Sequence, residues 1–139
     1  MDDLIKEHYN SEDIQGLNLY RDVKNWYSEV QYLDNENQFY LELFASSLIK
    51  KTDLNQQDIN FLNEELEMLK KKTDEVSHKL RDFLIEQEGM KECDDIHCET
   101  FFLNTHQKFK LEIENYFQQN RSLKTMLFSH LLKGIKKFL

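Results

Sequence analysis

The chain of 139 residues contains no proline and only three glycines, Gly16, Gly89 and Gly134. Proline interrupts a helix because it lacks a backbone donor and because its ring clashes with the preceding turn. Glycine is the other residue that weakens helix interiors. Because both are so scarce, long stretches of the chain contain nothing that stops a helix. The composition therefore permits helices much longer than the roughly 11 residues of an average one.

Long apolar runs are missing as well. No window approaches the roughly 18 consecutive apolar residues that cross a bilayer as a helix. The first ten residues, MDDLIKEHYN, have neither the basic start nor the apolar stretch of a secretory signal. We therefore expect a cytoplasmic protein in which the only two cysteines, Cys93 and Cys98, stay reduced.

Acidic side chains dominate most of the chain but are absent from its end. The net charge is -8, yet residues 121–139 carry five basic side chains and no acidic one, which leaves -13 on residues 1–120. Such an acidic body repels phosphate groups, so we expect no nucleic-acid partner. The basic C-terminal segment is the exception, and it is a candidate for contact with an anionic membrane surface.

Apolar residues make up 40% of the chain, and they recur in a regular pattern. Spacings of four and three alternate along three runs, which is typical of helices that pack side by side. The runs are Leu19, Val23, Trp26, Val30, Leu33, Asn37, Tyr40, Phe44 and Ser47; then Ile59, Leu62, Leu66, Leu69, Thr73, Val76, Leu80 and Phe83; then Phe102, His106, Phe109, Ile113, Tyr116, Asn120, Leu123 and Leu127. The sequence thus predicts an all-α fold, an antiparallel bundle of three long helices with coiled-coil-like packing. The bundle is expected to comprise residues 18–139, after a partly ordered N-terminal segment of residues 1–17.

Residues with capping chemistry mark the ends of the second helix. Thr52 or Asp53 can cap its start, with Gln56 three residues after Asp53 as in a capping box. Gly89 is placed to end this helix.

The third run has no strong breaker between about residues 97 and 137, so we predict one continuous helix there. The alternative is a break near residue 121, with a fourth helix capped by Ser122. No acidic residue follows Ser122 to complete a capping box, so a single helix is favoured.

Two asparagines occupy positions in the apolar runs, Asn37 in the first and Asn120 in the third. Folding the chain back near residues 52 and 93 brings both to the same level of the bundle. A buried amide pair can satisfy its own hydrogen bonds, and such layers help to fix helix register. We predict that the two side chains meet and set the register; a polar ligand site in that layer is the alternative.

The segment ECDDIHCE holds both cysteines and one histidine, and it is the one cluster of residue types that ligate metals. Cys93, His97 and Cys98 are candidate zinc ligands, but two adjacent ligands bind one ion awkwardly, and no second Cys or His pair lies at a suitable spacing. A disulfide between the cysteines is sterically possible but disfavoured in a reducing compartment. We favour a turn in which Asp94 or Asp95 caps the third helix and Cys98 packs as a small apolar side chain.

No arrangement of catalytic residues is recognisable. Glu75 and His78 have the Glu-x-x-His spacing of di-iron bundles, but Val76 and Leu80 occupy the apolar seam, so both polar side chains should face solvent. The three glycines are too far apart for a phosphate-binding loop. We expect no enzyme activity, no cofactor and no small-molecule substrate.

The chain has more apolar surface than three seams need. Extra aromatic and aliphatic residues widen the stripe on the first helix, and the segment TMLFSHLLKGIKKFL is apolar around most of its circumference. Exposed apolar residues of this kind mark partner surfaces. The alternatives are that the N-terminal segment covers the first surface and that the C-terminal segment docks within the same chain. Our candidate interface residues are Tyr32, Phe39, Leu43, Phe128, Leu131, Leu132 and Ile135.

Three functions are compatible with these features. The first, which we favour, is a non-enzymatic helical-bundle module for protein–protein interaction or scaffolding. We expect its partner to be a second copy of the chain in a homodimer, an unidentified protein, or both. The second is a peripheral membrane protein held on an anionic surface by the basic amphipathic segment 122–139. The third is a metal or redox sensor at Cys93, His97 and Cys98.

Overall fold

The computed structural model describes residues 11–87 and 96–135, with side chains from residue 18 onward. Within these ranges it contains three α-helices, α2 (Ser11–Ala45), α3 (Gln56–Glu86) and α4 (Ile96–Ile135). A short 3₁₀ helix, η1 (Ile49–Lys51), lies in the connection between α2 and α3. The predicted all-α bundle of three long helices is confirmed.

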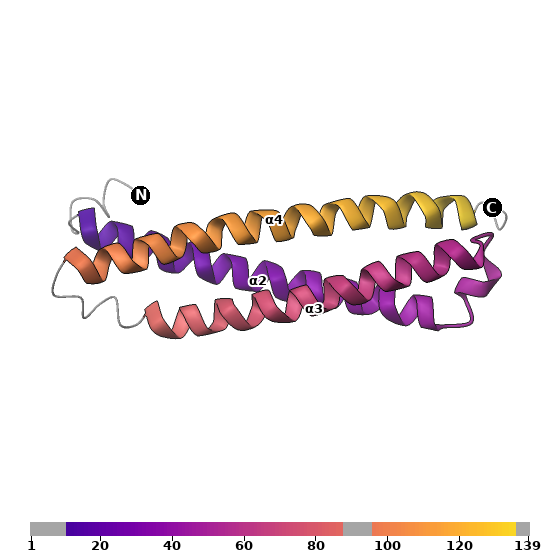
Figure 1. Cartoon of the computed structure of the whole chain (residues 1–139), viewed down its shortest axis with the longest axis horizontal. Helices are drawn as coiled ribbons and strands as arrows, with labels where there is room; N and C mark the ends of the chain where they lie inside the picture. Colours follow the sequence, from indigo (N-terminus) through magenta and orange to yellow (C-terminus); the bar gives the residue numbers. More distant parts are fainter. Residues whose placement is uncertain (1–10, 88–95, 136–139) are drawn as a thin grey trace.

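The helices lie side by side in an elongated bundle, and consecutive helices run in opposite directions (Figure 1). α2 and α4 therefore point the same way, because the chain reverses once before α3 and again before α4. The helices have 35, 31 and 40 residues, so each is about 45 to 60 Å long. Side chains far apart in sequence thus become neighbours along the whole length of α2 and α4.

The core consists mainly of the predicted seam residues. Every predicted seam residue of α3 is buried. In α4 only Phe109 is partly exposed, and in α2 Trp26, Leu33 and Tyr40 are partly buried against the core. The alternation of four and three in the sequence therefore identified the inner side of each helix.

The cap of α3 differs from the prediction. Asn55, and neither Thr52 nor Asp53, precedes the first turn, and its Oδ1 accepts a hydrogen bond from the Asp58 backbone N–H at 2.8 Å. The Thr52 hydroxyl instead donates to the Ile49 carbonyl at 2.6 Å and so helps to end η1. The prediction failed because the 3₁₀ turn lengthens the connection and moves the helix start toward the C-terminus.

Both ends of α2 also differ from those expected. The helix begins at Ser11, within the segment 1–17 for which only partial order is predicted. It ends at Ala45, so Ser47 is exposed beyond it and is not a seam residue. Ile49 of η1 is buried in its place, with 2% of its surface exposed.

α4 is one continuous helix, so the preferred prediction of a single third helix is confirmed and the predicted alternative of a fourth helix is wrong. No capping box competes with the helix at Ser122, and its neighbours Leu123 and Lys124 are buried against the rest of the bundle. Gly89, predicted to end the second helix, and Asp94 and Asp95, predicted to cap the start of the third, lie outside the described residues.

Gly134, in the last turn of α4, packs closely against the α2–α3 connection. Its carbonyl accepts a hydrogen bond from the Asp53 backbone N–H at 3.1 Å. A Cβ atom at this position would lie 3.2 Å from both the Thr52 Cβ and the Leu54 Cγ. The absent side chain therefore lets two backbone segments approach, and the end of α4 is fixed to the body of the protein.

Asn37 of α2 and Asn120 of α4 meet inside the bundle, as predicted. The Asn37 Nδ2 donates to the Asn120 Oδ1 at 3.4 Å, and the Asn120 Nδ2 donates to the Tyr116 backbone carbonyl at 3.3 Å. Beside them, the Tyr116 hydroxyl shares a hydrogen bond of 2.6 Å with the Thr73 hydroxyl of α3. Each of the three helices thus contributes to one buried polar layer, which favours this register over slipped alternatives.

Candidate partner-binding surface

The predicted interface residues on α2 and α4 include large apolar side chains that are exposed to solvent. Tyr32 and Phe39 of α2 are 59% and 60% exposed, whereas on α4 the exposed fractions are 56% for Phe128, 54% for Leu132 and 40% for Ile135. Residues seven apart on a helix lie on the same side, which groups Tyr32 with Phe39 and Phe128 with Ile135. Each helix therefore carries an exposed apolar stripe in addition to its buried one.

Aromatic contacts bring the two stripes together. The Tyr40 ring centroid lies 5.3 Å from that of Phe39 and 6.3 Å from that of Phe128. Leu43, one turn after Phe39, is partly buried, and Leu131 is partly buried against the core. Leu131 therefore belongs to the inner side of α4. We call the exposed surface the α2–α4 face, formed by Tyr32, Phe39, Leu43, Phe128, Leu132 and Ile135.

Charges of opposite sign accompany the two stripes. Between residues 25 and 45, α2 contains only acidic charged side chains, which are Glu29, Asp34, Glu36 and Glu42. Between residues 121 and 135, α4 contains only basic charged side chains, which are Arg121, Lys124 and Lys133. Asp34 is paired with Lys70 of α3, with 2.8 Å between Oδ1 and Nζ, so it lies on the side of α2 that faces α3. Lys133 is five residues from Phe128 and so projects about 140° away from it around α4. The charges that lie beside the apolar face are therefore Glu29 and Glu36 of α2 and Arg121 and Lys124 of α4.

Lys124 connects these two segments within the chain. Its Nζ lies 2.7 Å from Glu36 Oε1 and 5.5 Å from the centre of the Tyr40 ring. Only 7% of Lys124 is exposed, which makes this the most buried of the described ion pairs that involve a lysine. Burial, together with the nearby Glu36 carboxylate, raises the pKa of Tyr40. The pair holds α4 against α2 directly beneath the exposed face.

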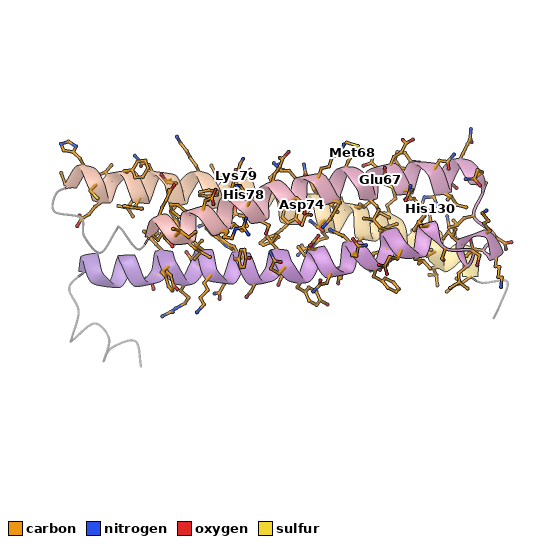
Figure 2. All side chains as sticks on the ribbon, turned by 90° about the horizontal axis from the view of Figure 1, so that it is seen from below. Glu67, Met68, Asp74, His78, Lys79 and His130 are labelled. Carbon is orange, nitrogen blue, oxygen red and sulfur yellow. The ribbon has the colours of Figure 1, made fainter. Side chains whose placement is uncertain are left out.

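The inner side of the same α4 segment is docked within the chain. Leu127 is fully buried. His130 Nδ1 lies 3.7 Å from Asp58 Oδ2 of α3, close to the end of the bundle where α2 and α3 are connected (Figure 2). Together with the Gly134 contact, these interactions fix the inner side of α4 and leave Phe128, Leu132 and Ile135 outside.

The buried asparagine layer contains one polar atom without a partner. The Asn37 Oδ1 accepts no hydrogen bond from any described residue, although the Asn37 side chain is fully buried. Burial raises the pKa of Tyr116, which keeps its hydroxyl protonated for the contact with Thr73. A ligand site needs several convergent unpaired groups, so one free oxygen supports a register role over the predicted alternative.

His106 is buried between α4 and α2. Its Nε2 lies 3.1 Å from Asp22 Oδ2, and its ring stacks on that of Trp26 with centroids 5.0 Å apart. Burial lowers the pKa of His106 below its ordinary value of 6.5, although the hydrogen bond with Asp22 opposes that shift. The arrangement holds a neutral ring against α2.

The prediction of reduced thiols is wrong at Cys98, which is disulfide-bonded. The chain's other cysteine, Cys93, lies outside the described residues. Cys98 is also partly buried against the core, whereas His97 is exposed at the start of α4. A disulfide-bonded sulfur offers no thiolate to a zinc ion, which removes Cys98 from the candidate ligands. The error came from the assumption of a reducing compartment. The spacing of the two cysteines did not itself exclude a disulfide bond.

Glu75 and His78 are both exposed on α3, as predicted from the seam. His78 Nε2 lies 3.3 Å from Asp82 Oδ2, one turn further along the same helix. Among residues 11–87 and 96–135, no three His, Cys, Asp or Glu side chains are grouped so that they could hold a metal ion. None of the described helices is long and apolar enough to cross a membrane.

Three exposed apolar residues of α3 were missed by the sequence analysis, and one of them is Ile85, which is 64% exposed. Phe61 and Met68 are 47% and 64% exposed, and Figure 2 marks Met68 on the outer edge of α3. They are seven residues apart, and each immediately precedes a seam residue, Leu62 or Leu69. That repeated offset from the seam is a signal by which they could have been found.

The fold and the surface together define a small all-α helical bundle with an exposed apolar face on two of its helices. No protein-family model matches the chain, and no curated protein or solved structure matches it either.

Proposed function

We propose that this protein is a non-enzymatic interaction module that binds a protein partner through the α2–α4 face. The observation that carries the proposal is the contact of Tyr40 with both Phe39 and Phe128. It unites two exposed apolar stripes that are distant in sequence into a single surface. Burial of apolar surface contributes about 25 cal/mol per Å², so a contiguous aromatic surface can supply substantial binding energy. Aromatic residues are also enriched where protein partners meet.

A second candidate is attachment to an anionic membrane surface through α4. Phe128, Leu132 and Ile135 are exposed beside a segment with only basic charges, which supports it. Two observations favour a protein partner instead. Lys124 is already paired with Glu36, and the acidic segment of α2 lies beside the same face, where it would repel anionic lipid headgroups.

The disulfide bond of Cys98 makes both a cytoplasmic location and a redox-sensing role less favoured. The disulfide bond of Cys98 argues against a reducing compartment, because such compartments keep most thiols reduced. A structural disulfide in an oxidising compartment accounts for the bond without a sensing role. We therefore rank the redox sensor third, behind the membrane-surface protein.

The proposed function can be tested with a photo-crosslinking amino acid placed at Phe39, at Phe128 or at Phe101 in cells that produce the protein. Phe101 is a matched control because it is 57% exposed on the same helix as Phe128. The two positions are about seven and a half helical turns apart and so project to opposite sides of α4. We expect protein adducts from positions 39 and 128 and none from position 101. Equal adducts from all three positions, or adducts with lipid alone, would contradict the proposal.

A further inference from the structure

We infer that the partner bound on the α2–α4 face is a second copy of this chain, related to the first by a two-fold axis parallel to the helices. The inference rests on the proposed function and specifies its partner. The charges on α2 and α4 and the register between these helices support it.

The two borders of the α2–α4 face are complementary to each other. A two-fold axis that runs along the helices places α2 of one copy opposite α4 of the other, with both copies pointing the same way. Glu29 and Glu36 of α2 then face the side of α4 that carries the exposed Arg121, twice in each pair. Electrostatic complementarity of this kind selects one docking orientation over others.

The register within one copy places particular charges at the same height. Asn37 of α2 contacts Asn120 of α4, so their sequence neighbours Glu36 and Arg121 are level with each other. Arg121 is exposed. Because the two copies are parallel and symmetric, Arg121 of one copy is also level with Glu36 of the second. The Arg121 guanidinium of one copy can then bind the Glu36 carboxylate of the second copy, which Lys124 of that second copy already contacts.

The other symmetric way to join the same faces is antiparallel, and it is less favourable. A two-fold axis perpendicular to the helices places α2 opposite α2 and α4 opposite α4. The acidic segments then face each other and so do the basic segments, which costs free energy through like-charge repulsion. The apolar residues would be covered in either orientation, so charge decides between them.

Sedimentation equilibrium of the full chain at several concentrations tests self-association. We expect a dimer, and we expect Phe128→Glu to weaken it by at least about 30-fold while the matched Phe101→Glu leaves it unchanged. A monomer at every concentration would overturn the inference. The proposed function would survive that result if crosslinks from positions 39 and 128 reach a protein of another mass, and it would fail if they reach none.

Charge reversal tests the contact between Arg121 and Glu36 of the second copy. We expect Arg121→Glu to weaken the dimer about 5- to 10-fold, because it replaces an attraction by a repulsion. Lys108→Glu is the matched control, since Lys108 is also exposed on α4 and lies seven residues from Phe101, on the side away from the α2–α4 face. Equal effects of the two reversals would overturn the charge argument.

Orientation can be measured with a spin label at Lys24, an exposed position of α2 that lies outside the stripe of Tyr32 and Phe39. The label is attached through Lys24→Cys without reductant, so that the disulfide of Cys98 stays intact. In the parallel dimer the two labels lie within about 30 Å, since neighbouring helices are packed about 8 to 10 Å apart. An antiparallel dimer centred on Phe39 and Phe128 separates them by about 45 Å. The longer distance would overturn the parallel arrangement without contradicting the proposed function.

Discussion

Asn37 and Asn120 occupy positions that apolar residues fill elsewhere in the seams, and their side chains hydrogen-bond to each other inside the bundle. A buried amide is costly when it is alone and acceptable when it is paired. The residue types, their place in the runs and the topology were together enough to predict the contact. The unpaired Asn37 Oδ1 could not be predicted, because it depends on the rotation of one side chain.

Substitution of the pair provides a test at the scale of single residues. Asn37→Leu or Asn120→Leu leaves the other amide buried without its partner, so we expect each to lower the unfolding free energy by about 1 to 3 kcal/mol. The double variant replaces the polar contact with an apolar one and should recover most of that loss. Urea denaturation of all four proteins measures the coupling. Additive losses in the double variant would show that the asparagines do not act as a pair.

His106 gives the stability of the protein a dependence on pH. Because burial lowers its pKa in the folded state, the unfolded chain binds a proton more readily below the ordinary value of 6.5. This contribution to stability is therefore complete above about pH 6.5 and is lost as the pH falls below it. We expect the unfolding free energy to decrease between pH 7 and pH 5.5, and His106→Gln to flatten that decrease. Equal slopes for the two proteins in urea titrations would contradict this assignment.

At the scale of the elements, α4 is continuous and has one buried apolar side and one exposed apolar side. Its inner side is fixed by Leu127, by His130 beside Asp58 and by the contact of Gly134 with the α2–α3 connection. Its outer side carries the apolar residues of the α2–α4 face. From the sequence, docking within the chain and availability to a partner were alternatives. In the structure the same helix is docked on one side and exposed to solvent on the other. The circumference of a helix can hold two apolar stripes, because the rest of the bundle covers only its inner side.

Gly134 tests the docking of the α4 end. We expect Gly134→Leu to lower the unfolding free energy by about 1 to 3 kcal/mol, because the new side chain must displace the Thr52 and Leu54 side chains. Leucine has the higher helix propensity, so a loss of stability can be assigned to packing. Ser122→Leu, at an exposed position of the same helix, is the control and should change stability by less than about 0.5 kcal/mol. A stabilised Gly134→Leu protein would show that the α4 end is not closely packed.

For the whole molecule, partner binding and folding must be separated experimentally, because the proposed partner surface and part of the core lie on the same helix, α4. Leu123 and Leu127 are buried in the core, and both lie after residue 121. A chain shortened at residue 121 therefore loses core residues as well as the exposed stripe. Point substitutions on the outer side of α4 are the appropriate way to test partner binding.

Truncation after Arg121 should accordingly unfold the bundle. We expect thermal unfolding, followed by circular dichroism, to lose its cooperative transition, because the α2–α3 pair is left with an uncovered apolar side. Phe128→Glu, which changes only an exposed position, should keep the cooperative transition of the native chain. A truncated protein with an unchanged midpoint would mean that the α4 end is an appendage.

The sequence by itself determined the fold class, the number of long helices, the inner side of each helix and the level at which Asn37 meets Asn120. These follow from the absence of proline and from apolar periodicity, which are local properties that act through helix geometry. The tertiary structure alone decided that the exposed stripes of α2 and α4 are adjacent and that Lys124 pairs with Glu36 beneath them. It also placed the cap of α3 at Asn55 and a disulfide at Cys98. The physical reason is that these features depend on the rotation of each helix about its axis and on the conformation of the connections. The spacing of apolar residues along a single helix encodes neither.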